Sequence, residues 1–277
     1  MKNDKIPLVA LLGSPISHSK SPMLHGYWLR KYGINGHYIP MDVNSADLDK
    51  VLETLPKMGF VGANVTIPHK ENVLKVADKI SDRAAMIGAA NTLSFGFKGQ
   101  IYADNTDGYG FIENIRQHQP DWCATEGPSL VLGAGGASRA VVSSLLQNAA
   151  SEIWITNRTR ARAEKISSDF GARVKVIDWF SVNKFLPDAA TVINATSLGM
   201  VGKPELTIDL KPLSHNTLVT DLIYNPLKTR LLIQAEKKGC RTVDGIGMLI
   251  HQAVPGFARW FNLQPTVDND LRDMLLL

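Results

Sequence analysis

The sequence predicts an α/β protein of two domains whose sheets are built largely from parallel strands. Short apolar runs alternate with amphipathic segments along the chain, a pattern typical of βαβ units with right-handed crossovers. The 277 residues suit one large domain or two of ordinary size. With 44% hydrophobic and 20% charged residues, the chain can bury a core and carries too little charge for a disordered protein.

The first half of the chain predicts five strands and three helical segments. The strands are expected at 8–12, 37–43, 60–67, 92–95 and 100–103, the last two joined by a hairpin at 96–99. Ser21 and Pro22 suit the start of a first helix, and Gly33 suits its end. Further helical segments are expected through 47–55 and from Pro68 through 80.

The second half predicts a more regular alternation. Strands are expected at 129–132, 152–156, 174–177, 191–194 and 218–221. Helices are expected at 109–117, 138–148 and 162–170, followed by a long amphipathic segment at 245–261 and a terminal helix at 271–276. We therefore predict one domain over 1–107, completed by 244–277, and a second over 108–243.

Charge and composition limit the partners. The net charge of +4 and the pI of about 9.0 invite a nucleic-acid interpretation. However, thirty basic residues against twenty-six acidic ones are a mild excess, aromatic residues make up 7%, and no run of five or six like charges occurs. No apolar stretch is long enough to span a membrane. Cys123 and Cys240 have no metal-site or disulfide spacing, so we expect a soluble protein of the reducing cytoplasm.

A glycine cluster between a predicted strand and a predicted helix suggests a phosphate cradle. The cluster is Gly133-Ala134-Gly135-Gly136-Ala137. Glycines let the backbone turn sharply and approach a pyrophosphate, which the helix N-terminus stabilises. Ser138 breaks the strict G-x-G-x-x-G pattern, so the cluster alone would also suit a tight turn without a ligand.

The end of the next predicted strand indicates which dinucleotide is bound. NAD-binding folds place an acidic residue there, about 20 residues after the glycines. This chain instead has Asn157, Arg158, Thr159, Arg160 and Arg162, with no carboxylate among them. Guanidinium groups bind phosphate in bidentate fashion, whereas cations at a helix N-terminus are otherwise disfavoured by the dipole. The sequence therefore predicts NADP(H), the alternative being a solvated first helical turn.

Polar residues of the first half gather where predicted strands begin or end. They are Ser17, Ser19, Ser21, Asn64, Thr66, Lys70, Asn91, Asp104, Asn105, Thr106 and Asp107. Alternation along a strand would place Asn64 and Thr66 on one face. Each residue alone also suits a cap, a turn or the surface. Together they supply hydroxyl, amide, ammonium and carboxylate groups without a metal-ligand set, which suits a small polyol carboxylate and an acid–base pair at a carbonyl.

Nine motifs, spread over nearly the whole chain, carry a family resemblance. They are GSPISHSKSPMLH, GANVTIPHK, GAANTL, DNTDGYGF, VLGAGGASRA, NRT, NATSLGM, DLIYNP and DGIGMLIHQA. In this order they resemble the shikimate dehydrogenase family of aromatic amino-acid biosynthesis. The resemblance implies an N-terminal substrate domain, a Rossmann-type NADP-binding domain and C-terminal helices that return to the first domain. It also implies reversible reduction of 3-dehydroshikimate to shikimate by NADPH, in a monomer or a homodimer.

The resemblance also implies roles for individual residues. Lys70 and Asp107 would form the catalytic pair. The substrate would be bound by Ser17, Ser19, Asn64, Thr66, Asn91, Tyr224 and Gln252. The pyrophosphate would lie on Gly133 through Ala137, and the adenosine phosphate on Asn157 through Arg162. Leu222, Gly245 and Met248 would line the nicotinamide, and Asp82 would also contact the cofactor.

Three other functions remain as alternatives. A quinate/shikimate dehydrogenase of the same superfamily would often accept NAD, which Asn157, Arg158 and Thr159 argue against. A catalytically idle NADP sensor or scaffold would be expected to lack Lys70 or Asp107, and both are present. A nucleic-acid binder fits the sequence least well, since no reading motif is found.

Overall fold

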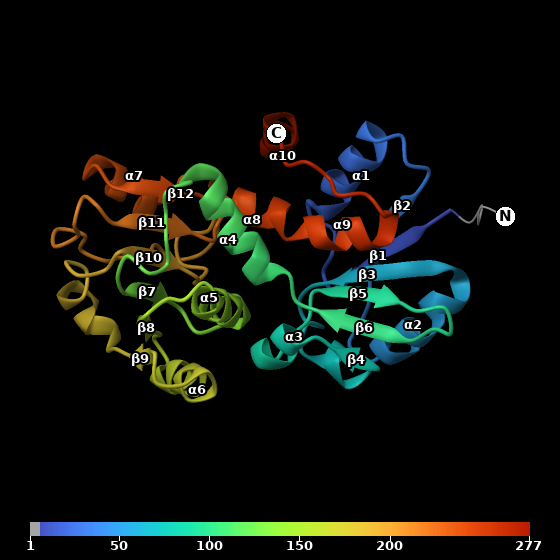
Figure 1. The fold of residues 1–277 in the computed structure, drawn as a ribbon, viewed down its shortest axis with the longest axis horizontal. Helices are drawn as coiled ribbons and strands as arrows, with labels where there is room; N and C mark the ends of the chain where they lie inside the picture. The colour runs from blue at the N-terminus through green and yellow to red at the C-terminus, as the bar shows by residue number, and fades with distance from the viewer. Residues whose placement is uncertain (1–5) are drawn as a thin grey trace. The chain divides into compact units, whose positions relative to one another are not determined.

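The computed structural model describes residues 6–277 and divides into two compact units (Figure 1). Unit 1 comprises the described residues up to Thr106 together with Ile250–Leu277, and unit 2 comprises Asp107–Leu249. The predicted two-domain α/β class is confirmed. The sequence placed the two boundaries after residues 107 and 243. The structure divides after Thr106 and again after Leu249, within helix α8 (Ile246–His251).

Unit 1 contains a six-stranded mixed sheet in the order β2-β1-β3-β5-β6-β4. Its strands are β1 (Leu8–Gly13), β2 (His37–Asp42), β3 (Phe60–Val65), β4 (Lys79–Ile80), β5 (Thr92–Phe95) and β6 (Ile101–Asp104). β1 is parallel to β2 and β3, whereas β5 is antiparallel to both of its neighbours. The carboxyl ends of β1, β3 and β6 and the start of β5 therefore share one edge.

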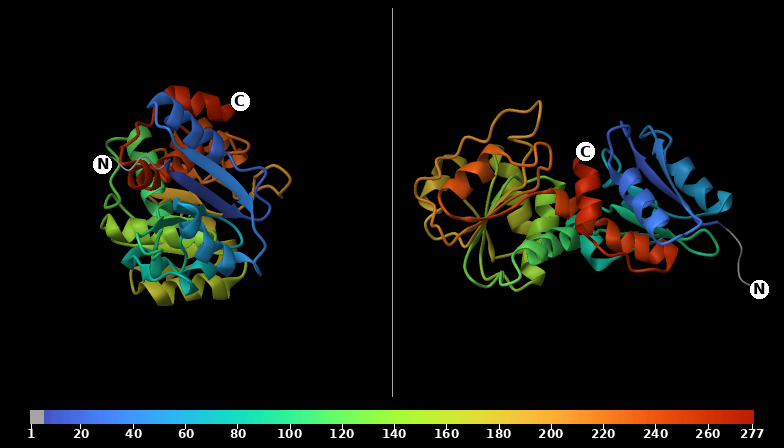
Figure 2. Two further views of the ribbon diagram at one scale, coloured as in Figure 1. Left: turned by 90° about the vertical axis from the view of Figure 1, so that its right-hand side faces the viewer. Right: turned by 90° about the horizontal axis from the view of Figure 1, so that it is seen from above.

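Helices cover both faces of this sheet (Figure 2). They are α1 (Ser21–Lys31), α2 (Leu48–Thr54), α3 (Asp82–Ile87), α9 (Ala253–Phe261) and α10 (Asn269–Leu276), with 3-10 turns η1 (Leu55–Met58) and η2 (Asn72–Lys75). Leu48 and Leu52 of α2 pack in one cluster with Ala10 and Leu12 of β1. On α9, the indole of Trp260 donates to the Leu93 carbonyl at 2.9 Å, which fastens the C-terminal segment to β5.

One helix expected in unit 1 is absent, and the long amphipathic segment expected near the C-terminus consists of two helices. The helical segment expected from Pro68 through 80 is instead a turn, η2 and the short strand β4, followed by the unpredicted α3. The Asp78 carboxylate accepts the N–H of Ile101 at 2.7 Å, and pairing with β6 replaces the helix. The single segment expected over 245–261 is two helices that meet at Gln252.

Unit 2 contains a six-stranded, fully parallel sheet in the order β12-β11-β10-β7-β8-β9. Its strands are β7 (Ser129–Leu132), β8 (Ile153–Thr156), β9 (Val174–Val176), β10 (Thr191–Asn194), β11 (Leu218–Asp221) and β12 (Arg241–Val243). Its helices are α4 (Asp107–His118), α5 (Gly136–Gln147), α6 (Arg160–Phe170), η3 (Trp179–Lys184), α7 (Arg230–Lys237) and α8.

The strands of unit 2 are apolar on both faces because helices cover both. Val131 of β7 packs in a cluster with residues of α4, α5 and α6, while its neighbours Leu130 and Leu132 pack in a second cluster with residues of α7 and η3. This double burial explains the continuous apolar runs in the sequence. Among residues 6–277, no helix is long and apolar enough to cross a membrane.

A buried histidine in unit 1 makes the stability depend on pH. His25 of α1 is fully buried, and its ring stacks on Tyr38 with centroids 4.0 Å apart. Burial lowers the pKa of His25 from 6.5 to about 3. Between these values the unfolded chain binds a proton that the folded protein excludes, so stability falls as the pH drops from about 6.5 toward 3.

We expect the free energy of unfolding to fall between pH 8 and pH 5 by about 2 kcal/mol more in the wild type than in His25→Phe. Phenylalanine keeps an aromatic ring in the stack and removes the titrating nitrogens. Urea denaturation of both proteins at the two pH values measures the difference. An identical pH dependence would contradict this assignment.

Candidate active site

The polar residues expected to bind substrate follow from the strand directions in unit 1. The loop after β1 carries Ser17 and Ser19, the turn after β3 carries Thr66 and Lys70, and Asn91 precedes β5. All these segments leave or enter the sheet at the shared edge. The Ser14 N–H donates to the Ile67 carbonyl at 3.0 Å, which joins the first two segments directly.

Asn64 is buried on β3 with both the oxygen and the nitrogen of its amide engaged. Its Nδ2 donates to the Asn91 carbonyl at 2.9 Å, and its Oδ1 accepts the Tyr38 hydroxyl at 2.7 Å. Tyr38 therefore fixes the orientation of the amide, a role that the sequence did not reveal. Because β3 ends at Val65, Thr66 lies in the turn beyond the strand rather than on the strand as expected.

Asn91 links the sheet edge to the C-terminal segment. Its Oδ1 accepts the N–H and the hydroxyl of Thr106 at 2.9 and 3.1 Å, and its Nδ2 donates to Gln252 Oε1 at 3.1 Å. The Thr106 hydroxyl also donates to the Gln252 carbonyl at 2.8 Å. Two of the predicted substrate residues, 161 positions apart in the chain, are thus in contact within unit 1.

Lys70 extends from a turn whose backbone is held at several points. Its carbonyl accepts the Ala90 N–H at 2.8 Å, and the Thr66 carbonyl accepts the N–H of His69 at 2.9 Å. The buried His69 ring donates through Nε2 to the Val43 carbonyl at 2.7 Å. His69 is therefore an anchor of this turn, whereas the side chain of Lys70 is only partly buried.

Asp107 is the first residue of α4, two positions earlier than the expected helix start, and it is buried. It follows Asn105 and Thr106, which are both fixed in unit 1. Asn105 Nδ2 donates to the Ala89 carbonyl at 2.9 Å, and Thr106 bonds to Asn91. Asp107, expected to supply the catalytic carboxylate, therefore directly follows two residues that are held by hydrogen bonds.

The other predicted substrate residues lie apart from this network. Ser17 is exposed in the loop after β1, and the partly buried Ser19 accepts the Ser21 N–H at 3.3 Å. Tyr224 lies in unit 2, in the loop after β11. Asp82, expected to contact the cofactor, is the exposed first residue of α3 in unit 1.

The residues predicted to bind the pyrophosphate and the adenosine phosphate lie at the carboxyl edge of the parallel sheet in unit 2. The strand order reverses between β7 and β10, and ligands of open parallel sheets bind outside the strand ends at such a point. Gly133 follows β7 with a φ of +110°, and a Cβ there would lie 2.8 Å from the Ala195 carbonyl oxygen after β10. Glycine is required at this position for both reasons.

The cradle after Gly133 is open. Apart from the adjacent residues and the backbone of its own helix, a Cβ added at Gly135 or Gly136 would meet no atom of residues 6–277 within 4 Å, so a pyrophosphate could approach the backbone at the start of α5. Ser138, which breaks the glycine pattern, is fully buried, and its hydroxyl accepts the Gly135 N–H at 3.2 Å. Ser138 therefore stabilises the glycine turn through its side chain, at the position where the dinucleotide-binding pattern has a third glycine.

The arginines after β8 are exposed at the start of α6. Arg160 is engaged, since its Nε donates to Glu164 at 2.8 Å. Within the described part of the chain, no salt bridge joins Arg158 or Arg162 to a carboxylate. Asn157 Nδ2 donates to the Thr159 carbonyl at 2.9 Å and closes the turn. The residues present thus fit a phosphate at this helix start.

Leu222, Gly245 and Met248 also belong to unit 2. Leu222 and Met248 pack against the same core cluster as Ala134 of the glycine turn. A Cβ at Gly245 would lie 2.4 Å from the Leu222 carbonyl oxygen, so the chain after β12 passes close against the loop after β11. These three residues line one part of the carboxyl edge.

A buried polar network beneath this edge was missed by sequence reasoning. The Asp221 carboxylate accepts bonds from Asn194 Nδ2 at 3.0 and 3.1 Å and from the Thr229 hydroxyl at 2.7 Å. Burial raises the pKa of Asp221, while these bonds act in the opposite direction. The network joins the ends of β10 and β11. In the sequence, its residues Asn194 and Asp221 are the first residues of the motifs NATSLGM and DLIYNP.

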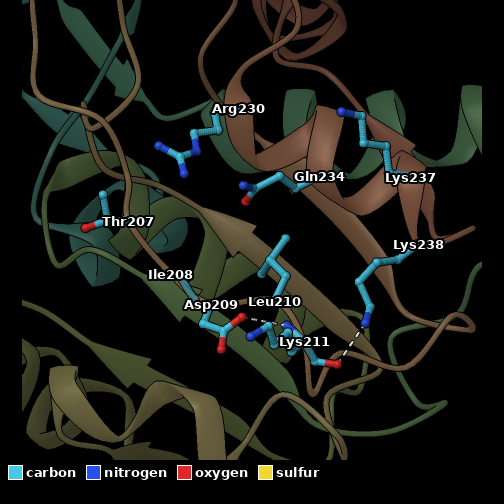
Figure 3. Close-up of a pocket in the computed structure, with 9 residues that line it drawn as sticks. All are labelled: Thr207, Ile208, Asp209, Leu210, Lys211, Arg230, Gln234, Lys237 and Lys238. Carbon is cyan, nitrogen blue, oxygen red and sulfur yellow. Dashed lines mark hydrogen bonds between the residues drawn. The ribbon is translucent and has the colours of Figure 1, made fainter.

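A separate pocket of about 560 Å³ lies in unit 2 beside α7 (Figure 3). Arg230, Gln234 and Lys237 of α7 face the loop at 207–211, and Lys238 Nζ donates to the Lys211 carbonyl at 2.7 Å. None of the residues predicted for substrate or cofactor lines it.

Comparison with known proteins agrees with this geometry. Residues 11–93 match the family model described as the shikimate dehydrogenase substrate binding domain, and residues 122–222 match the model described as shikimate / quinate 5-dehydrogenase. A curated protein of Roseobacter denitrificans named shikimate dehydrogenase (NADP(+)) is 60% identical over 276 residues, which cover 100% of both chains.

Two solved structures share the fold over nearly their whole length. Shikimate 5-dehydrogenase from Thermus thermophilus, in complex with NADP(H) and shikimate, superposes with a TM-score of 0.85 at 32% identity, covering 98% of this chain and 97% of that one. Quinate dehydrogenase from Corynebacterium glutamicum, in complex with NAD, has a TM-score of 0.91 at 29% identity, covering 98% and 99%.

Proposed function

Because the chain belongs to the shikimate dehydrogenase family and is an NADP-dependent oxidoreductase, we propose that it interconverts shikimate and 3-dehydroshikimate through Lys70 and Asp107. The observation that supports these residue roles is the shared edge of unit 1. There Asn91 is hydrogen-bonded to Asn64 and to Gln252, and the Lys70 carbonyl accepts the N–H of Ala90, the residue before Asn91.

The edge offers the groups that a hydroxylated ring carboxylate requires. Ser17 and Ser19 would donate hydroxyl bonds to the substrate carboxylate, and Tyr224 would also help to bind it. Asn64, Thr66, Asn91 and Gln252 would bond the ring hydroxyls and the carbonyl region. Since Asn64 and Asn91 are already held by protein partners, they would bind without first being ordered.

When bound, NADPH would supply the hydride that reduces the substrate ketone. Lys70 would stabilise the negative charge that develops on the carbonyl oxygen and would deliver the proton that completes the alcohol. Asp107 would hold the lysine and the reacting hydroxyl by hydrogen bonds. In the reverse direction the same pair would accept the proton as shikimate is oxidised.

The cofactor would be held by unit 2. Gly133 through Ala137 would cradle the pyrophosphate, and Arg158 and Arg162 would bind the ribose 2′-phosphate together with Asn157, Thr159 and Arg160. Leu222, Gly245 and Met248 would line the nicotinamide, and Asp82 would also contact the cofactor. We also propose a cytoplasmic enzyme, since both cysteines are free, and a monomer or homodimer.

We expect the purified protein to reduce NADP⁺ with shikimate, followed as absorbance at 340 nm. Quinate and NAD⁺ serve as comparison substrates in the same assay, and both should be used less efficiently. No absorbance change with shikimate would overturn the proposed reaction. Equal efficiency with NADP⁺ and NAD⁺ would favour the quinate-type alternative.

A further inference from the structure

One carboxylate of unit 1 holds together three elements around the proposed substrate residues. Asp104, the last residue of β6, is 4% exposed. Arg83 of α3 donates from Nε to Oδ1 at 2.6 Å and from Nη2 to Oδ2 at 2.5 Å. Arg259 of α9 also donates to Oδ2. The Ser81 hydroxyl and the Asn105 N–H each donate to Oδ1 at 2.8 Å.

This arrangement keeps the carboxylate ionised. Burial by itself would raise the pKa of Asp104, but the hydrogen bonds from Arg83, Ser81 and Arg259 hold the pKa well below its usual range. A charge-assisted pair with two arginines, one of them bidentate, also has a defined geometry that a single flexible pair lacks. The positions of α3 and α9 against the end of β6 are therefore closely defined.

The bonds of Asp104 lead directly to Asn91 and Gln252. Its backbone carbonyl accepts the Asn91 N–H at 3.0 Å, and two positions later Thr106 bonds both the Asn91 side chain and the Gln252 carbonyl. Gln252 immediately precedes α9, the helix that Arg259 fastens to Asp104. Asp104 thus helps to fix the position of Asn91 through a backbone hydrogen bond, and that of Gln252 through the ion pair that holds α9.

We propose that Asp104, with Arg83 and Arg259, is a positioning residue that sets Asn91 and Gln252 in the arrangement that binds shikimate. This inference rests on the proposed function of the site. It predicts that loosening the triad weakens substrate binding, while the steps carried by Lys70 and the binding of NADP⁺ by unit 2 are preserved.

The test uses Arg259→Ala, in which Arg83 still pairs with the carboxylate, and Arg259→Lys, which keeps a cation. Lys31→Ala is the matched control, since Lys31 bonds Asp268 and fastens the same C-terminal segment to α1 at another place. We expect Arg259→Ala to raise KM for shikimate about 10-fold or more, because small displacements of binding groups have effects of this size. Its kcat and its KM for NADP⁺ should stay within about threefold of the wild type.

Three results decide the proposal. Arg259→Lys should recover part of the lost affinity, and Lys31→Ala should lower the melting temperature without changing KM for shikimate. An unchanged KM in a folded Arg259→Ala, or an equal rise in Lys31→Ala, would show a merely structural role and overturn the proposal. A wild type without turnover on shikimate would instead overturn the proposed function, and this inference with it.

Discussion

Lys70→Ala should lower kcat by about 10²-fold or more while KM for shikimate changes little. Removing a positioned proton donor costs a factor of this size, and the loss falls on the transition state rather than on the bound substrate. The turn that carries Lys70 is held by the bonds of His69 and of the Lys70 carbonyl, which do not involve the lysine side chain. The substitution should therefore leave the surrounding edge intact.

Lys75→Ala is the matched control for this experiment. Lys75 lies on η2 in the same segment and is exposed, and its Nζ donates to the nearby Asn72 Oδ1 at 3.0 Å. We expect wild-type kcat from it. Lys70→Arg separates the role of the positive charge from that of proton transfer, since arginine keeps the charge but does not release its proton in proteins. Turnover of Lys70→Ala at the wild-type rate would refute the assignment of the proton donor to Lys70.

Most strands of unit 2 could be predicted because local sequence and tertiary burial agree there, although β12 and the helix α7 were not among the expected elements. In unit 2, strands buried on both faces give unbroken apolar runs, and the expected strands at 129–132, 191–194 and 218–221 match β7, β10 and β11. In unit 1, β4 has two residues and is stabilised by pairing with β6, far away in the sequence. So short a strand has no periodicity of its own, and the sequence pattern of this region therefore favours a helix.

In the candidate site, too, the features that are local in the sequence could be predicted, and those that depend on distant contacts could not. The glycine turn and the arginines after β8 are local features, and their positions at strand ends could be predicted from chain order alone. The support of the substrate edge is not local. Tyr38 orients Asn64 from β2, and Arg259 reaches Asp104 across 155 positions. The family resemblance named Asn64 and Gln252, but neither it nor the spacing indicated what holds them.

The second large effect concerns the choice of cofactor. Arg158→Ala combined with Arg162→Ala should lower kcat/KM for NADP⁺ by about 10²-fold or more, and should leave kcat/KM for NAD⁺ nearly unchanged. Hydrogen bonds to a charged group contribute about 1.5–3 kcal/mol each, and NAD⁺ lacks the phosphate that would receive them. Steady-state rates with both dinucleotides at saturating shikimate measure the ratio.

Lys165→Ala provides the control on the same helix. Lys165 is exposed on α6, and its Nζ pairs with Asp169 at 2.7 Å, so removing it changes the net charge of α6 by one unit without removing a proposed phosphate ligand. Arg160→Ala should have a smaller effect than either of the other arginine substitutions, because Glu164 already engages its guanidinium. If Lys165→Ala lowered the NADP⁺ preference as much as the double variant, the preference would come from the general charge of α6. A specific loss in the double variant would instead place the 2′-phosphate at Arg158 and Arg162.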